Sequence, residues 1–196
     1  MTWRWALGSP ATAFGGTASV PPYGVTIRRM DAPTDSRLIR PALDSDAEPM
    51  RALLNEIIRI GGTTAITSEL SVDEMREWFI SGADVVSCFL AINANGEILG
   101  FQSLSRYGDL QEGWVDIATF ASRSRQKSGV GGALFAHTRA AAAQYGFTTI
   151  NASIRVDNTG GLAYYGKMGF VTYRVEDGDP RLQGRTFNRV HKRYDI

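Results

Sequence analysis

The sequence of 196 residues has one cysteine, Cys88, and two histidines, His137 and His191. A single cysteine excludes a disulfide within the chain and fits a reducing compartment, so we expect a cytoplasmic protein. Three soft ligands are too few for a recognisable zinc site, because structural zinc sites take four Cys or His ligands. We therefore expect no metal.

An excess of charge and a long apolar run are also missing. The formal net charge is +1, from 21 Lys and Arg against 20 Asp and Glu. A nucleic-acid-binding domain gathers basic residues on one face, so we expect no nucleic-acid partner. The chain has no run of about 18 apolar residues, so we expect no membrane-spanning helix. The length suits a single globular domain.

Residues 1–35 differ in composition from the rest of the chain. They are rich in Gly, Pro, Ala, Ser and Thr and have no sustained hydrophobic period. We expect a disordered N-terminal extension, followed by one domain over residues 36–196. A secretory signal is the alternative, but Arg4 and Pro10 interrupt the apolar segment that it needs. We hypothesise that the working protein starts at Met30, just before the first patterned segment.

The hydrophobic pattern predicts a strand, two helices, three strands, a helix, a strand, a helix and two strands. The expected strands cover residues 37–43, 85–92, 97–105, 114–121, 148–156, 170–175 and 187–194. Asn95-Gly96 favours a hairpin, and the helix between residues 121 and 148 predicts a right-handed parallel crossover. We expect an α/β (α+β) domain with a single mixed, mostly antiparallel sheet and flanking helices.

Three of the expected helices carry local signals. Asp44 or Asp46 is expected to cap the first, and Ser71 with Glu74 forms a capping box for the second. The helix that begins near Val130 has an expected buried stripe at three- and four-residue steps. Its members are Val130, Leu134, Thr138, Ala141 and Tyr145.

The turn over residues 125–132, with the sequence RQKSGVGG, lies between an expected strand and this helix. Its three glycines allow backbone conformations that a Cβ would forbid, so several N–H groups can face one anion. The helix N-terminus adds the positive end of its dipole, and Arg125 and Lys127 add charge. The turn predicts a phosphate site; a tight connection without a ligand is the alternative.

Two known phosphate-binding motifs are alternatives for this turn. A P-loop needs GxxxxGK followed by Ser or Thr, which the sequence lacks. A dinucleotide-binding turn needs GxGxxG, but Leu134 replaces the third glycine and residues 122–128 separate the strand from the first. Asp157, at the end of the next strand, keeps this second alternative open.

Written from Gln126 to Gly131, the turn resembles the Q/R-x-x-G-x-G/A motif of the GNAT superfamily, the acyl-CoA-dependent N-acyltransferases. A second segment agrees with the same superfamily. Asn158, Tyr165 and Gly169-Phe170 reproduce the spacing N-(x)6-Y-(x)3-G-F. The resemblance covers about residues 36–194 and implies an N-acetyltransferase domain with the GNAT-like fold.

The resemblance implies that acetyl-CoA is the donor cosubstrate, with its pyrophosphate in the glycine turn and its pantetheine arm along the preceding strand. The implied binding residues are Ile117, Ala118, Thr119, Phe120, Arg125, Gln126, Lys127, Ser128, Gly129, Val130, Gly131, Gly132, Asn158 and Tyr165. Asn158 is also expected to cap the helix that it precedes.

The chemistry requires a base, an oxyanion donor and an acid. Asp116, where many members of the superfamily have a glutamate, is the first candidate base and Glu112 the second; a solvated or ion-paired carboxylate is the alternative for Asp116. A backbone N–H near Thr119 is expected to hold the oxyanion. Tyr165 matches the superfamily's proton donor, with a core tyrosine as the alternative, and Tyr164 is expected to face elsewhere.

We expect direct transfer of the acetyl group to a primary amine, because Cys88 has the setting of a small buried residue. The resemblance implies that residues 61–68, 106–114 and 176–184 shape the acceptor site. Three carboxylates in the last segment favour a small cationic amine. A protein or peptide N-acetyltransferase and a non-catalytic acyl-CoA sensor are the alternatives. The sequence does not decide between a monomer and a homodimer.

Overall fold

The structure of the protein is a computed structural model that describes residues 37–106, 110–122, 129–177 and 188–196. The predicted disordered extension over residues 1–35 lies outside these ranges and stays a prediction, as does the domain boundary that follows it. None of the helices in the described ranges is long and apolar enough to cross a membrane.

The described residues form four α-helices and one seven-stranded sheet. The strands are β1 (Leu38–Pro41), β2 (Val85–Ile92), β3 (Ile98–Ser105), β4 (Trp114–Ala121), β5 (Thr149–Arg155), β6 (Val171–Glu176) and β7 (Arg189–Asp195). The helices are α1 (Ala47–Ile60), α2 (Val72–Phe79), α3 (Val130–Gln144) and α4 (Thr159–Lys167), with a short 3-10 turn at Asp44–Asp46.

The sheet order is β1-β2-β3-β4-β5-β7-β6. Only the pair β4 and β5 is parallel; the other five pairs in this sheet are antiparallel. This confirms the mixed, mostly antiparallel sheet expected from the sequence, and α3 is the crossover that the glycine turn leads into. The Asn-Gly hairpin between β2 and β3 is confirmed as well, with Gly96 at φ 81°.

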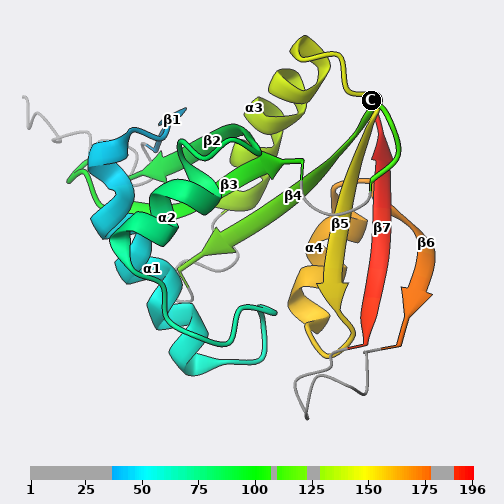
Figure 1. Ribbon diagram of the computed structural model, residues 1–196, viewed down its shortest axis with the longest axis horizontal. Coiled ribbons are helices and arrows are strands. Elements are labelled where there is room, and N and C mark those ends of the chain that lie inside the picture. The colour runs from blue at the N-terminus through cyan, green and yellow to red at the C-terminus, as the bar shows by residue number, and fades with distance from the viewer. Residues whose placement is uncertain (1–36, 107–109, 123–128, 178–187) are drawn as a thin grey trace, which may run out of the picture. The chain divides into compact units, whose positions relative to one another are not determined.

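The helices cover the two faces of the sheet separately (Figure 1). On one face α1 and α2 pack against β2, β3 and β4 around Met50, Met75 and Phe101. On the other face α3 and α4 enclose the apolar side of β4 and β5, with Phe135 and Ile150 among the buried residues. Because side chains alternate along a strand, β4 contributes residues to both layers.

The cap of the second helix is as predicted, whereas that of the first is not. The Ser71 hydroxyl accepts from Glu74 N–H, and the Glu74 carboxylate accepts from Ser71 N–H at 2.7 Å. Asp46 occupies the N-cap position of α1, but its side chain makes no cap bond. Its carboxylate instead accepts two bonds from Arg40, both 2.7 Å long, and one from Leu43 N–H at 2.8 Å, which caps the 3-10 turn before α1.

The expected stripe of α3 is right at four positions and wrong at the fifth. Val130, Leu134, Thr138 and Ala141 are buried, whereas Tyr145 is 60% exposed. Tyr145 is the C-cap residue, so the helix ends before its side chain can reach the sheet.

Candidate active site

The two parallel strands β4 and β5 pair only near their first residues, and beyond this point they diverge (Figure 1). The pairs are Trp114 with Thr149, Val115 with Ile150, and Asp116 with Asn151. A cleft of about 2100 Å³ lies here, with walls from β4, β5, α4, the start of α3 and the segment between α1 and α2. It is larger than the roughly 300–1000 Å³ of most small-ligand pockets, so it has room for two substrates.

The start of α3 forms one end of the cleft and has the features of an anion site. Gly129 is the N-cap residue and adopts the left-handed conformation, with φ 79°. The first helical bond runs from Ala133 N–H to the Gly129 carbonyl. The amides of Val130, Gly131 and Gly132 precede it, and such amides at a helix N-terminus bind phosphate groups.

Tyr164 of α4 is packed directly on this helix start. Its hydroxyl donates to the Gly131 carbonyl at 2.8 Å, and a Cβ added at Gly131 would lie 2.6 Å from the Tyr164 ring. Only glycine therefore fits between the two helices at this point. The expectation that Tyr164 faces elsewhere is wrong, because α4 lies so close to α3 that two neighbouring residues of α4 both line the cleft.

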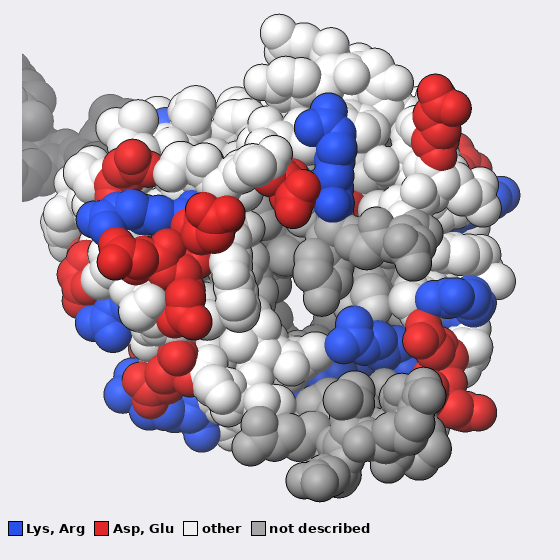
Figure 2. All heavy atoms as spheres, viewed as in Figure 1, with Lys and Arg blue, Asp and Glu red and all other residues white. Residues whose placement is uncertain are grey.

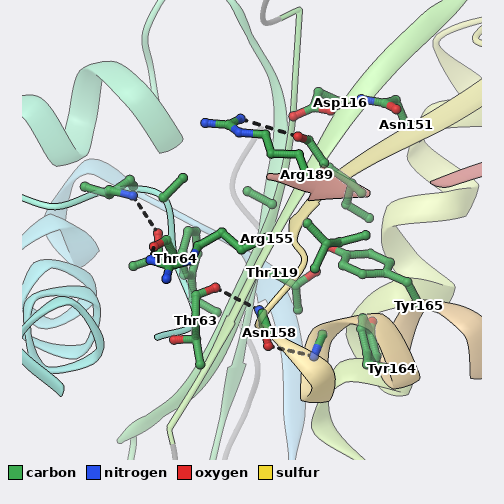
Figure 3. A pocket seen from close by; sticks show the side chains of 18 of the residues that line it. Thr63, Thr64, Asp116, Thr119, Asn151, Arg155, Asn158, Tyr164, Tyr165 and Arg189 are labelled. Atoms are coloured by element: carbon green, nitrogen blue, oxygen red, sulfur yellow. Dashed lines mark hydrogen bonds between the residues drawn. The ribbon is translucent and has the colours of Figure 1, made fainter. Parts of the chain in front are cut away.

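Tyr165 belongs to an uncharged network on the α3 and α4 face of β4. Its hydroxyl lies 2.8 Å from Thr119 Oγ1, and Gln102 Nε2 of β3 donates to the same Thr119 atom at 2.7 Å. Gln102 Nε2 also lies 3.1 Å from the Tyr164 hydroxyl. Figure 3 shows Thr119 and the two tyrosines together at the edge of the cleft.

Both tyrosines hold their protons firmly. Burial is the main cause that raises the pKa of Tyr165 far above its ordinary value, and the bond to Thr119 opposes this only in part. The pKa of Tyr164 is raised for the same reason. At neutral pH each side chain is therefore a phenol, which can donate a proton and not abstract one.

Asp116 lies on the opposite side of β4, beside Asn151 and apart from the two tyrosines (Figure 3). Its carboxylate accepts from Asn151 Nδ2 at 2.6 Å, and Asn151 Oδ1 accepts from the Tyr173 hydroxyl at 2.8 Å. Burial raises the pKa of Asp116 to about 7, while the bond to Asn151 and the charge of Arg189 lower it. A carboxyl with such a pKa can take up and release a proton near neutral pH.

Aromatic and basic side chains complete the wall around Asp116. Trp114 and Tyr173 meet edge to face, with ring centroids 5.4 Å apart. Arg189 lines the cleft and approaches Ser153 Oγ with one guanidinium nitrogen at 3.4 Å. The space-filling view shows a hollow here, with basic and acidic side chains both near its rim (Figure 2).

Of the three carboxylates in the acidic last segment, the structure describes Glu176 and Asp177. Glu176 accepts from Arg174 at 2.7 Å and lies 2.8 Å from His191 Nε2. Asp177 is exposed, and Asp179 lies outside the described residues. The charge of Glu176 is therefore balanced within the protein, and this weakens the reason for expecting a cationic acceptor.

The segment between α1 and α2 is tied to the far side of the cleft. Asn158 Nδ2 donates to the Thr63 carbonyl at 2.8 Å, and Arg155 donates to the Thr64 carbonyl at 3.1 Å (Figure 3). Asn158 Oδ1 also accepts from Gly161 N–H at 2.8 Å, which confirms it as the cap of α4. Any role of Asn158 toward a cofactor stays a prediction.

Most of the described site residues predicted from the sequence lie around this one cleft. They are Asp116, Ile117, Ala118, Thr119, Phe120, Gly129, Val130, Gly131, Gly132, Asn158 and Tyr165. Arg125, Gln126, Lys127 and Ser128 lie outside the described residues. Glu112 is exposed in the turn before β4 and does not line the cleft, so the geometry gives it no contact with a substrate there.

Four polar residues of the site were not predicted from the sequence: Gln102, Asn151, Tyr173 and Arg189. A signal for two of them was present, since Gln102 lies inside a mainly apolar strand and Asn151 lies between Ile150 and Ala152. Both are buried, with exposures of 0% and 3%. A buried amide needs partners, so each pointed to a polar neighbour on an adjacent strand.

Comparison with known proteins agrees with the geometry of the cleft. The model of the acetyltransferase (GNAT) family matches residues 51–170, more than half of the chain. No curated protein matches the sequence.

Solved structures share the fold at low sequence identity. A ribosomal-protein-alanine N-acetyltransferase from Brucella melitensis is 15% identical with a TM-score of 0.70, over 81% of this chain and 99% of that one. A phosphinothricin acetyltransferase from Sinorhizobium meliloti, in complex with acetyl-CoA, is 19% identical with a TM-score of 0.71, over 82% and 88%. A GCN5-related N-acetyltransferase from Kribbella flavida is 18% identical with a TM-score of 0.69, over 82% and 98%.

The family match confirms the resemblance seen in the glycine turn and in the segment from Asn158 to Phe170. It also agrees with the cleft between β4 and β5, the glycine-rich start of α3 and the seven-stranded sheet. The chain therefore belongs to the acetyltransferase (GNAT) family and is an acetyl-CoA-dependent acetyltransferase.

Proposed function

We propose that the protein transfers an acetyl group from acetyl-CoA directly to a primary amine of a small molecule. The observation that carries the proposal is the position of β4 in the cleft. One side of this strand presents Asp116, whose pKa is about 7, and on the other side Thr119 contacts the protonated phenol of Tyr165 from α4. A base on the strand and an acid on the neighbouring helix, near a helix N-terminus that suits an anion, fit acyl transfer from a thioester.

The residues around the start of α3 fit acetyl-CoA. The amides of Val130, Gly131 and Gly132 would hold the pyrophosphate, and Gly131 leaves space that a Cβ would fill. Within the described residues β4 has no ladder partner on its β5 side beyond Asp116, so its backbone there would bind the amide-rich pantetheine arm. Bound acetyl-CoA supplies the thioester carbonyl that the amine attacks.

Asp116 would prepare the amine for this attack. A primary amine with a pKa of about 10 is mostly protonated at neutral pH and has to lose a proton before its nitrogen can form a bond. Because the pKa of Asp116 is about 7, a useful fraction of this carboxyl is ionised in the same pH range. It takes the proton directly or through one water.

Tyr165 would complete the transfer. As the new C–N bond forms and the C–S bond breaks, the electron pair of the C–S bond moves to sulfur. Tyr165 then donates its proton to the sulfur, which gives the free thiol, while the acylated nitrogen releases its excess proton to solvent and leaves as a neutral amide. Tyr165 regains a proton from solvent before the next turnover. A backbone N–H of β4 near Thr119 is the proposed donor to the oxyanion.

Two further observations support direct transfer to a small acceptor. Cys88 is buried, and burial raises the pKa of its thiol, so it is no candidate for an acylated nucleophile. The bonds from Arg155 and Asn158 hold the segment at Thr63 and Thr64 across the cleft, which favours a small amine over an extended peptide. The cytoplasm remains the proposed location, and a homodimer is not required by this site.

Calorimetric titration with acetyl-CoA tests the donor, and thiol release over a panel of amines tests the acceptor. The panel contains lysine, spermidine, an uncharged alkylamine, phosphinothricin and a short peptide that begins with alanine; the last two reflect the names of structurally similar proteins. We expect 1:1 binding and turnover with at least one small amine. Turnover of the peptide alone would favour the protein acetyltransferase, and binding without any turnover would favour the acyl-CoA sensor.

A further inference from the structure

The hydroxyl of Tyr165 belongs to a network of side-chain hydrogen bonds. Tyr164, Gln102 and Thr119 are its other members. Gln102 is fully buried and its Oε1 has no hydrogen-bond partner among the described residues. A buried amide with an unpaired oxygen destabilises the fold, so the Gln102 amide calls for an explanation beyond stability.

The first two directions follow from the number of protons that each group carries. The Gly131 carbonyl only accepts, so Tyr164 donates its single proton there and accepts from Gln102 Nε2. The amide nitrogen of Gln102 therefore faces both Tyr164 and Thr119. If the Gln102 amide were reversed, its Oε1 would face Tyr164, whose single proton would then have two acceptors. The N–H groups of Gln102 would take the buried position of Oε1, where no described group accepts from them.

Thr119 Oγ1 accepts from Gln102 Nε2 at 2.7 Å. It also lies 2.8 Å from the Tyr165 hydroxyl, where either oxygen can be the donor, and Tyr164 is a further neighbour of the Thr119 hydroxyl. The direction that frees the Tyr165 proton has Thr119 as the donor. Tyr165 is then an acceptor in the network, and its phenol proton is left for a group in the cleft that Tyr165 lines.

We propose that Gln102 and Thr119 are positioning residues that direct the phenol proton of Tyr165 toward the departing sulfur. The inference rests on the proposed function, because it needs Tyr165 as the acid. When the C–S bond breaks, the electron pair goes to sulfur, the Tyr165 proton follows it, and Thr119 donates to the phenolate that forms. A hydrogen bond to a charged oxygen is stronger than one to a neutral oxygen, so the bond from Thr119 strengthens during the step.

A double-mutant cycle between Thr119→Val and Tyr165→Phe tests the proposal. Thiol release from acetyl-CoA is measured with the panel amine of highest turnover and, in parallel, with water as the only acceptor. We expect Thr119→Val to lower kcat about tenfold, with the calorimetric Kd for acetyl-CoA unchanged within about twofold, because it removes a donor to charge that develops only in the transition state. In the Tyr165→Phe background the same change should alter kcat less than about twofold.

Two variants control for structural effects. Thr119→Ser keeps the hydroxyl and should restore kcat to nearly the wild-type value. Thr138→Val makes the same chemical change at another buried threonine, whose hydroxyl has no partner among the described residues, and should leave kcat unchanged. If Thr119→Val does not fold, Thr119→Ala, which removes the same hydroxyl and adds no atom, replaces it in the cycle.

The outcomes separate this inference from the proposed function. If Tyr165→Phe turns over at the wild-type rate, Tyr165 is not the acid and the proposed chemistry fails. If Tyr165→Phe is slow but Thr119→Val is not, only the roles of Thr119 and Gln102 fail. An equal effect of Thr119→Val in both backgrounds would also overturn these roles, because it would mean that the threonine acts independently of the Tyr165 hydroxyl.

Discussion

The two sides of β4 differ in chemistry although they belong to one short strand. The side that faces α3 and α4 carries Thr119, which contacts the phenol of Tyr165 in a network without formal charge. The other side carries Asp116, beside the amide of Asn151 and within the field of Arg189. Strand alternation alone separates the two groups, since residues 116 and 119 point to opposite faces.

Burial raises the pKa of a group on each side of β4, yet the two groups have opposite proposed roles. It raises the pKa of Asp116 to about 7, where a carboxyl can exchange protons at neutral pH. It also raises the pKa of Tyr165, which was already high, so the phenol stays protonated. The same desolvation therefore makes one acid a candidate base at neutral pH and keeps the other protonated.

Tyr165→Phe should have the largest effect, because it removes the proton donor and retains the ring. We expect kcat for thiol release to fall about 100-fold, within the range for general acid catalysis. The Kd for acetyl-CoA should stay within about twofold of the wild-type value, since the hydroxyl contacts Thr119 and not the anion site. An equal loss of binding and turnover would indicate a structural tyrosine.

Asp116→Asn should change the pH dependence of stability on the other side of the strand. The unfolded carboxyl has a pKa near 3.9, and the folded one a pKa of about 7, so the folded state binds the proton more tightly. The contribution of Asp116 to stability is therefore fully present below pH 4 and is lost as the pH rises to 7. We compare the free energy of unfolding of the variant with that of wild type. This difference should be about 1 to 4 kcal/mol more favourable to the variant at pH 8 than at pH 4. Urea unfolding at both pH values measures it.

A carboxyl with the opposite shift is the control for this prediction. Arg155 lowers the pKa of Asp157, so Asp157→Asn should lose stability at pH 8 relative to pH 4. If Asp116→Asn shows the same sign as Asp157→Asn, the carboxyl of Asp116 is not buried in the way described here.

Gly131→Ala tests the contact between α3 and α4 at Tyr164, which belongs to the network of Tyr165. The added Cβ would lie 2.6 Å from the Tyr164 ring, so the ring or the helix start must move. We expect the affinity for acetyl-CoA, measured by calorimetry, to fall about tenfold. Gly166→Ala is the matched control, because a Cβ there meets nothing within 4 Å, and it should leave the affinity unchanged.

The smallest effect is expected at the hydrogen bond from Asn158 to the Thr63 carbonyl. Asn158→Asp keeps the oxygen that caps α4 and loses the N–H that reaches the Thr63 carbonyl. We expect thermal stability within about 0.5 kcal/mol of wild type, whereas Asn158→Ala should cost about 1 kcal/mol because the cap is lost as well. Equal losses in the two variants would show that the bond to Thr63, and not the cap, carries the stability.

The sequence predicted the elements of the fold well because their signals are local. Alternating apolar strands, the Ser71 capping box and the Asn95-Gly96 turn each depend on residues a few positions apart. The errors occurred where the surroundings of a side chain in the fold decide the outcome. Asp46 turns from the helix toward Arg40, and Tyr145 lies beyond the reach of the sheet.

The site divides in the same way. The glycine turn, Asp116 and Tyr165 were found from motifs, and those that the structure describes line one cleft. Gln102 contacts Tyr164 across 62 residues of sequence, and Asn151 contacts Asp116 across 35. Such pairs depend on strand register and on the approach of α4, neither of which local periodicity determines. Glu112 shows the converse, since closeness in sequence to β4 did not bring it into the cleft.

The pH profile of kcat/KM for the acceptor tests the division between the two sides of β4 most directly. We predict that wild-type activity rises with pH through about 7, as Asp116 loses its proton. Asp116→Asn should lack this limb and show only the rise from the amine itself, near pH 10 for a lysine-like acceptor. Tyr165→Phe should keep the limb at a lower rate. A limb near pH 7 that persists in Asp116→Asn would contradict the account.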